Sequence, residues 1–136
     1  MNVDDKRVAL VTGANRGIGF EIAGQLASKG MTVIIGARDE DRGADARDKL
    51  ASRNLDVHSY LLDVTDRTTI PSAIGKIRDK FGRLDVLVNN AGILIDSETG
   101  ILELSVDLFE NTLKTNAFGP LLLGQACIPI MKENGY

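Results

Sequence analysis

The chain has 136 residues, which is enough for one domain with a hydrophobic core and too few for two. It is 43% hydrophobic and 26% charged, an ordinary balance for a globular protein that excludes a disordered tail or a fibrous repeat. The net charge is -3 with acids and bases interspersed, so no basic stripe favours a nucleic-acid partner.

The predicted location is cytoplasmic, with no membrane partner. Residues 1–7 are polar and charged and lack the apolar segment of a secretory signal, and no apolar run is long enough to span a bilayer. The single cysteine, Cys127, lies in an apolar stretch, which favours a packing residue in a reducing compartment. The single histidine, His58, has no metal-ligand spacing around it, so no metal site is predicted.

The first half of the chain alternates between strand and helix patterns. A β-rich run at 7–12 predicts the first strand, and a run at 31–35 predicts the second. Between them lies a helical pattern with Gly30 as its C-terminal cap. The predicted buried face of this helix consists of Ile18, Ile22, Leu26 and Ala27. A second helix, with a weaker apolar stripe, follows the second strand.

The alternation continues through the second half. The third predicted strand covers 55–62, and the helix after it runs to Phe81 with Thr65 or Asp66 as its N-cap. The fourth predicted strand covers 84–88. Ser105 is the candidate cap of a further helix, and an apolar segment at 121–131 follows Pro120.

This order of elements predicts an α/β fold. Strands and helices that alternate with short links imply right-handed crossovers and a parallel sheet. Four strands then take the order 3-2-1-4, the first part of a Rossmann-type doubly wound sheet, and residues 1–136 form a single domain. The fourth strand becomes a sheet edge, so we expect self-association through this edge or through the helices.

A glycine-rich turn joins the first strand to the first helix at Thr12–Gly19, which reads TGANRGIG. A phosphate at a helix N-terminus meets free N–H groups and the positive end of the helix dipole. Gly13 permits a tight turn, Gly17 lets a pyrophosphate approach, and Gly19 lets the helix lie close to the strand. The spacing is G-x-x-x-G-x-G, which differs from the G-x-G-x-x-G of many dinucleotide-binding folds. The alternative is that the three glycines merely shape a tight turn. The other residues of the predicted binding turn are Asn15, Arg16 and Ile18.

The end of the second predicted strand, Gly36–Asp39, bears on the choice of cofactor. An acidic residue there would bind the adenosine ribose and favour NAD. Arg38 comes first, and its planar guanidinium suits the 2′-phosphate of NADP. Arg16 is a second cation nearby. The sequence therefore predicts NADP, while Asp39 keeps NAD possible. The alternative is that both arginines are solvated surface charges without a ligand.

Three further motifs define a resemblance. Asp63-Val64 follows the third strand, Asn89–Gly92 reads NNAG after the fourth, and Asn116 lies within KTNAFG. Together with the glycine turn, this ordered set resembles the short-chain dehydrogenase/reductase family. The stretches GARDEDRG and TLKTNAFGP look most like its NADPH-dependent carbonyl-reductase-like members. The resemblance covers the whole chain.

The resemblance implies a role for each motif. The pyrophosphate would lie on the three glycines of the turn, and Arg16 and Arg38 would hold the 2′-phosphate. Asp63 would accept a hydrogen bond from the adenine amino group, beside the Val64 backbone. Asn90 would brace the central sheet, while Ala91 and Gly92 would let the cofactor ribose pass closely.

Asn116 is similar to the catalytic asparagine of the family, which positions a water in a proton relay. Its amide competes with the helical backbone, so a structural kink before Gly119-Pro120 is the alternative. Asp63 could instead initiate the following helix, and Asn90 could be a strand-end turn residue.

The resemblance implies an NADP-dependent oxidoreductase that transfers hydride between NADPH and a small carbonyl or alcohol substrate. The reaction of the family also needs a serine and a Tyr-x-x-x-Lys pair. Tyr60 is followed four places on by Val64, and Tyr136 is the last residue. We therefore expect a truncated, N-terminal part that is inactive alone. A catalytically inactive dinucleotide-binding module and a binder of another nucleotide are the alternatives.

Overall fold

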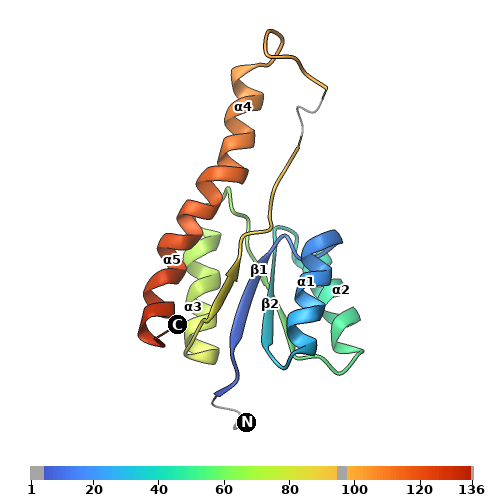
Figure 1. The fold of residues 1–136 in the computed structure, drawn as a ribbon, viewed down its shortest axis with the longest axis vertical. Coiled ribbons are helices and arrows are strands. Elements are labelled where there is room, and N and C mark those ends of the chain that lie inside the picture. Colours follow the sequence, from blue (N-terminus) through green and yellow to red (C-terminus); the bar gives the residue numbers. More distant parts are fainter. Residues whose placement is uncertain (1–4, 95–97, 136) are drawn as a thin grey trace.

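A four-stranded parallel sheet forms the centre of the computed structural model, which describes residues 5–94 and 98–135 (Figure 1). Its strands are β1 (Val8–Thr12), β2 (Thr32–Ala37), β3 (Val57–Leu61) and β4 (Val86–Val88). The order β3-β2-β1-β4 confirms the predicted 3-2-1-4 arrangement and the Rossmann-type fold. β1 and β2 are buried along their whole length, whereas β3 and β4 form the two edges.

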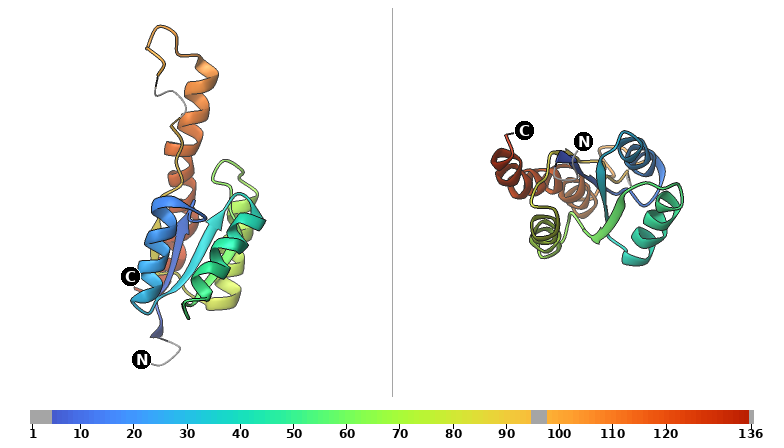
Figure 2. Two further views of the ribbon diagram at one scale, coloured as in Figure 1. Left: turned by 90° about the vertical axis from the view of Figure 1, so that its right-hand side faces the viewer. Right: turned by 90° about the horizontal axis from the view of Figure 1, so that it is seen from below.

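Helices cover both faces of the sheet. They are α1 (Gly17–Ser28), α2 (Glu40–Ala51), α3 (Thr69–Phe81), α4 (Val106–Leu113), the π-helical turn η2 (Lys114–Phe118) and α5 (Gly119–Glu133). Figure 2 shows α1 and α2 on one face, with α3 and α5 on the other. Alternate residues of the central strands feed the two cores, as the twofold period of a strand requires. Ala9 and Val11 of β1, for example, face α1 and α2, whereas Leu10 faces α3 and α5.

The predicted buried face of α1 is wrong in part. Gly19, Ala23 and Ala27, spaced four residues apart, are its buried residues, whereas Ile18 is 75% exposed. Because α1 approaches the sheet closely, only small residues fit on the side that faces it. Ile22 and Leu26 pack at the flanks and are half-buried.

The helix starts test the predicted caps. The Ser105 hydroxyl accepts a hydrogen bond from the Leu108 N–H at 3.1 Å, which confirms it as the N-cap of α4. The prediction for α3 is wrong, because the helix begins at Thr69 with Thr68 as its N-cap. Asp66 instead closes the turn before the helix, where Oδ1 accepts from the Thr68 N–H at 2.9 Å.

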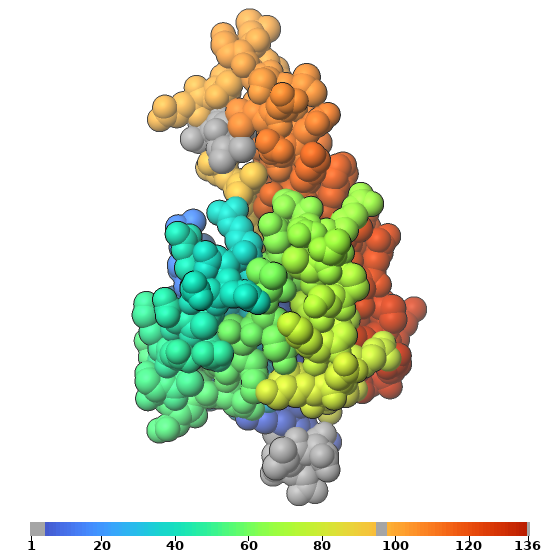
Figure 3. Space-filling view, turned by 180° about the vertical axis from the view of Figure 1, so that it is seen from behind, coloured from blue at the N-terminus to red at the C-terminus, as the bar shows by residue number. Residues whose placement is uncertain are grey.

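The segments α4, η2 and α5 follow one another as a continuous helical rod (Figure 1). Its α5 part packs on the sheet through Leu123, Cys127 and Ile130, but α4 has no buried residue. Seen from behind, α4 stands clear of the body of the molecule (Figure 3). Within the residues that the structure describes, no helix combines the length and the apolar character needed to cross a membrane.

Candidate dinucleotide-binding site

A pocket of about 410 Å³ opens at the carboxyl ends of the strands. The loops that follow all four strands contribute to its walls, together with Thr115 of η2. Every residue that the sequence predicts to bind the cofactor lines this pocket except Gly19. The pocket also has lining residues that sequence reasoning did not assign to the site, namely Arg42, Leu62, Thr65, Ile93 and Thr115.

The turn between β1 and α1 needs two of its glycines for their backbone conformation. Gly13 and Gly17 have φ angles of 61° and 60°, in the left-handed region that side chains disfavour. A Cβ at Gly13 would also lie 3.0 Å from the Ala91 Cα, so the glycine lets β1 approach the loop after β4. The first turn of α1 has no side-chain cap and no acidic residue. Its N–H groups are therefore available to an anion.

Gly19 contributes through packing and does not reach the pocket. A Cβ there would overlap the Asn90 Nδ2 and lie 2.8 Å from the Gly13 carbonyl oxygen. Asn90 Nδ2 donates to the carbonyl oxygens of Thr12 at 3.0 Å and Gly13 at 3.2 Å. The missing side chain of Gly19 thus leaves room for an amide that ties β4 to the start of the turn.

Thr12 makes a second connection between β1 and the loop after β4, and the sequence did not predict this connection. Its hydroxyl accepts hydrogen bonds from the N–H groups of Asn90 at 3.1 Å and Ala91 at 3.0 Å, and it is 1% exposed. The only available signal was a hydroxyl residue at the end of a buried strand. Hydrogen bonds of the Thr12 and Asn90 side chains therefore hold the ends of β1 and β4 together, in addition to the pairing of these two strands in the sheet.

Three exposed arginines line one end of the pocket: Arg16 before α1, Arg38 after β2 and Arg42 in α2. None of their side chains forms an ion pair or hydrogen bond with another residue in the described part of the chain. Asp39, between two of them, accepts a hydrogen bond from the Arg42 N–H at 3.0 Å and caps α2. Arg42 lies in the first turn of α2, three residues after the cap Asp39, and this position shortly after Arg38 is the signal that could have revealed it.

The loop after β3 places Asp63 and Val64 in the wall. Asp63 Oδ1 accepts from the N–H of Thr65 at 2.9 Å and from its hydroxyl at 2.7 Å. Because α3 begins only at Thr69, Asp63 shapes this loop and is not the cap of the helix. Val64 is 5% exposed and borders both the pocket and the core.

Asn116 does not line the pocket but holds one of its loops. Its Oδ1 accepts from the Ile93 N–H at 2.9 Å, and its Nδ2 donates to the Ile93 carbonyl oxygen at 2.8 Å. Asn116 lies within η2, a π-helical turn that continues into α5. The side chain therefore joins this turn to the loop after β4.

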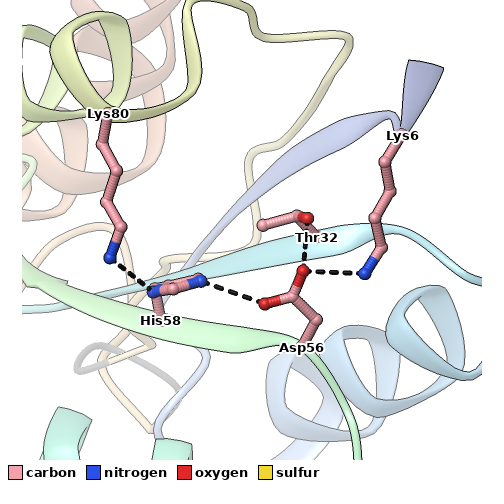
Figure 4. A network of polar contacts seen from close by, with 5 residues as sticks. All are labelled: Lys6, Thr32, Asp56, His58 and Lys80. Atoms are coloured by element: carbon pink, nitrogen blue, oxygen red, sulfur yellow. Dashed lines mark hydrogen bonds and ion pairs between the residues drawn. The ribbon is translucent and has the colours of Figure 1, made fainter. Parts of the chain in front are cut away.

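A second polar cluster lies away from the pocket, near the amino ends of β2 and β3 (Figure 4). Burial alone would raise the pKa of Asp56, but hydrogen bonds from Lys6, Thr32 and His58 outweigh it and lower the pKa to about 2. Burial lowers the pKa of His58, and the nearby Lys80 ammonium lowers it further against the opposing effect of Asp56. This cluster connects β2, β3 and α3, and none of its five labelled residues lines the pocket.

The fold and the pocket agree with the family that the sequence matches. The family model described as short chain dehydrogenase matches residues 7–136. The chain belongs to this family, which confirms the resemblance.

Relatives with known names or structures extend the comparison. The chain is 39% identical to short-chain dehydrogenase/reductase 1 of Saponaria officinalis over 93% of its length and 49% of that protein. It is also 39% identical to the (+)-neomenthol dehydrogenase of Arabidopsis thaliana, over 97% of its length and 51% of that protein. A metagenomic short-chain oxidoreductase in complex with NADP superposes with a TM-score of 0.87 at 30% identity, covering 94% of this chain and 57% of that chain. The chain thus spans about half the length of the curated relatives it matches.

Proposed function

We propose that this domain is the NADP-binding part of an oxidoreductase that interconverts a small carbonyl compound and an alcohol. The observation that carries the proposal is the joining of an uncapped helix start to three arginines in one pocket. Two of the relatives described above, a neomenthol dehydrogenase and an oxidoreductase bound to NADP, support the same class of reaction.

The pocket residues fit the chemistry of the dinucleotide. The N–H groups at the start of α1 and the turn at Gly13 and Gly17 suit a diphosphate. The Asp63 carboxylate suits the adenine amino group, and the small residues Ala91 and Gly92 leave room for a ribose. When bound, the cofactor supplies the hydride, and these residues orient it.

The arrangement around Arg38 favours NADP over NAD. Asp39 caps α2 through Oδ1 and stands between Arg38 and Arg42, whose two positive charges favour a phosphate over uncharged ribose hydroxyls. Arg16, Arg38 and Arg42 offer planar donors to a dianionic 2′-phosphate. This proposal adds Arg42 to the two arginines that the sequence indicates.

Asn116 acts as a positioning residue in this proposal. Both polar atoms of its amide are hydrogen-bonded to the Ile93 backbone, so the amide keeps the loop after β4 in place beside the pocket.

Titration calorimetry with NADPH, NADH and 2′,5′-ADP tests the cofactor assignment. Replacing Arg38 or Arg42 by Ala should weaken NADPH and 2′,5′-ADP binding by roughly tenfold or more, since each charge-assisted hydrogen bond contributes about 1.5–3 kcal/mol. NADH binding should change little.

The matched control is Arg47→Ala, which removes an arginine of the same helix outside the pocket and should leave all three affinities unchanged. Equal wild-type affinity for NADPH and NADH would refute the choice of NADP. Absence of binding by all three ligands would refute the nucleotide-binding function itself.

A further inference from the structure

The π turn η2 and the residue after it touch the pocket wall at three successive places. Thr115 lines the pocket directly, and Asn116 holds Ile93 through both atoms of its amide. Gly119, the first residue of α5, then packs against Val64 on the opposite wall. The junction between η2 and α5 is therefore in contact with two separate loops of the pocket.

The contact of Gly119 with Val64 leaves no space for a side chain. A Cβ at Gly119 would lie 2.9 Å from both Cβ and Cγ2 of Val64, and 3.4 Å from its carbonyl oxygen. Gly119 has helical backbone angles, φ -55° and ψ -56°, so any residue could adopt its conformation. Packing against Val64 is thus the reason that the structure requires glycine here.

The surroundings of Val64 determine where it would move if it were pushed. Val64 belongs to a buried cluster with Leu62, Ile70 and Leu123, and none of these four residues is more than 5% exposed. Close-packed interiors yield little to an added methyl group. Val64 lines the pocket, which is the open space beside it, so we expect a displaced Val64 to narrow the pocket.

We propose that Gly119 is a positioning residue of the nucleotide pocket: its missing side chain lets α5 pack directly on Val64 and so sets the position of that wall. The inference rests on the proposed nucleotide-binding function. Gly119 itself does not line the pocket, so its effect on binding passes through Val64.

Substitution of Gly119 by Ala tests the inference in the whole chain. Calorimetry should show binding of NADPH and of 2′,5′-ADP weakened by roughly tenfold, the effect of moving a packed wall into the pocket. Gly124→Ala is the matched control, because it makes the same change in the same helix and its Cβ would meet only Ile128 Cδ1, at 3.9 Å. This control should bind both ligands as the wild type does.

A second substitution, at Val64, distinguishes an effect on the position of the pocket wall from a simple loss of stability. Val64→Gly removes both side-chain atoms that the new methyl group would meet. In that background, Gly119→Ala should change either affinity by roughly twofold or less, because the two effects are coupled through one contact. The double variant also serves if the single Gly119→Ala variant fails to fold.

The outcomes are distinct. Unchanged binding by Gly119→Ala, or an equal loss on adding it to Val64→Gly, would overturn the role of Gly119 while the nucleotide-binding function stands. A wild-type chain that binds neither ligand would overturn both proposals together.

Discussion

At the scale of single residues, the Asn90 side chain makes contacts beside the pocket that only a hydrogen-bond donor can make. Its Nδ2 donates to two main-chain carbonyl oxygens, those of Thr12 and Gly13, so only a donor fits at this position. Asn90→Asp would place a carboxylate against the two acceptors. We expect the free energy of unfolding to fall by roughly 1–3 kcal/mol, the usual cost of a buried polar group left unsatisfied.

Urea denaturation checks this expectation. Asn89→Asp is the control, because Asn89 is exposed and its replacement introduces the same negative charge one residue away from Asn90. If the two variants were equally stable, the amide of Asn90 would not brace the sheet.

The residues of the pocket differ in how far the sequence reveals them. The glycines of the turn were predictable because a positive φ and a close approach to the backbone each demand that residue type. Arg42 was missed, although its spacing from Arg38 was visible, because a charged helix face is usually solvated. The contacts of Thr12 and Ile93 could not be predicted, since they join segments more than twenty residues apart.

At the scale of elements, the cluster around His58 connects the edge strand β3 to α3. Lys80 can only donate, so His58 Nδ1 accepts from it and Nε2 carries the proton that is donated to Asp56. This arrangement requires neutral His58. The histidine pKa is lowered in the folded protein, so the unfolded chain takes up a proton at higher pH than the folded chain does.

The free energy of unfolding should therefore decrease as the pH falls from above 6.5 through the lowered pKa of His58. Chemical denaturation of the wild type and of His58→Gln across this window measures the effect. The variant should show the shallower dependence on pH. Identical slopes would mean that His58 does not couple protonation to folding.

Element types and strand order were predictable because apolar runs and helical periods alternate without interruption. The errors lie where tertiary packing overrides the local pattern. The buried face of α1 is set by its closeness to the sheet, which selects Gly19, Ala23 and Ala27 over the larger aliphatic residues. The start of α3 shifted to Thr69 because Asp63 and Asp66 form turns of their own.

At the scale of the whole molecule, the proposed cofactor pocket belongs to a chain that spans about half the length of its curated relatives. The sequence contains no tyrosine followed four residues later by lysine. We expect the purified chain to bind NADPH and to show no carbonyl-dependent oxidation of it. The reason is that a tyrosine phenol without a lysine partner is a poor acid at neutral pH. Absorbance of NADPH in the presence of small ketones and aldehydes provides the assay, and sustained turnover would contradict the expectation.

Self-association stays a prediction, and the structure supplies two surfaces for it. β4 is an edge strand, as expected. The larger apolar side chains on the surface include Val106 and Phe109 of α4 and Leu121 and Ile128 of α5. The helical rod therefore carries exposed apolar side chains of its own, in addition to the strand edge that the sequence indicates.

The buried thiol of Cys127 gives the molecule an internal reporter of opening. Cys127 is the single cysteine of the chain, is fully buried between α5 and the sheet, and has a pKa that burial raises to about 12. An alkylating reagent needs an accessible thiolate, so labelling at neutral pH has to wait until α5 separates from the sheet. The rate of labelling then counts those separations, and a nucleotide held between the four loops would slow it in proportion to its occupancy.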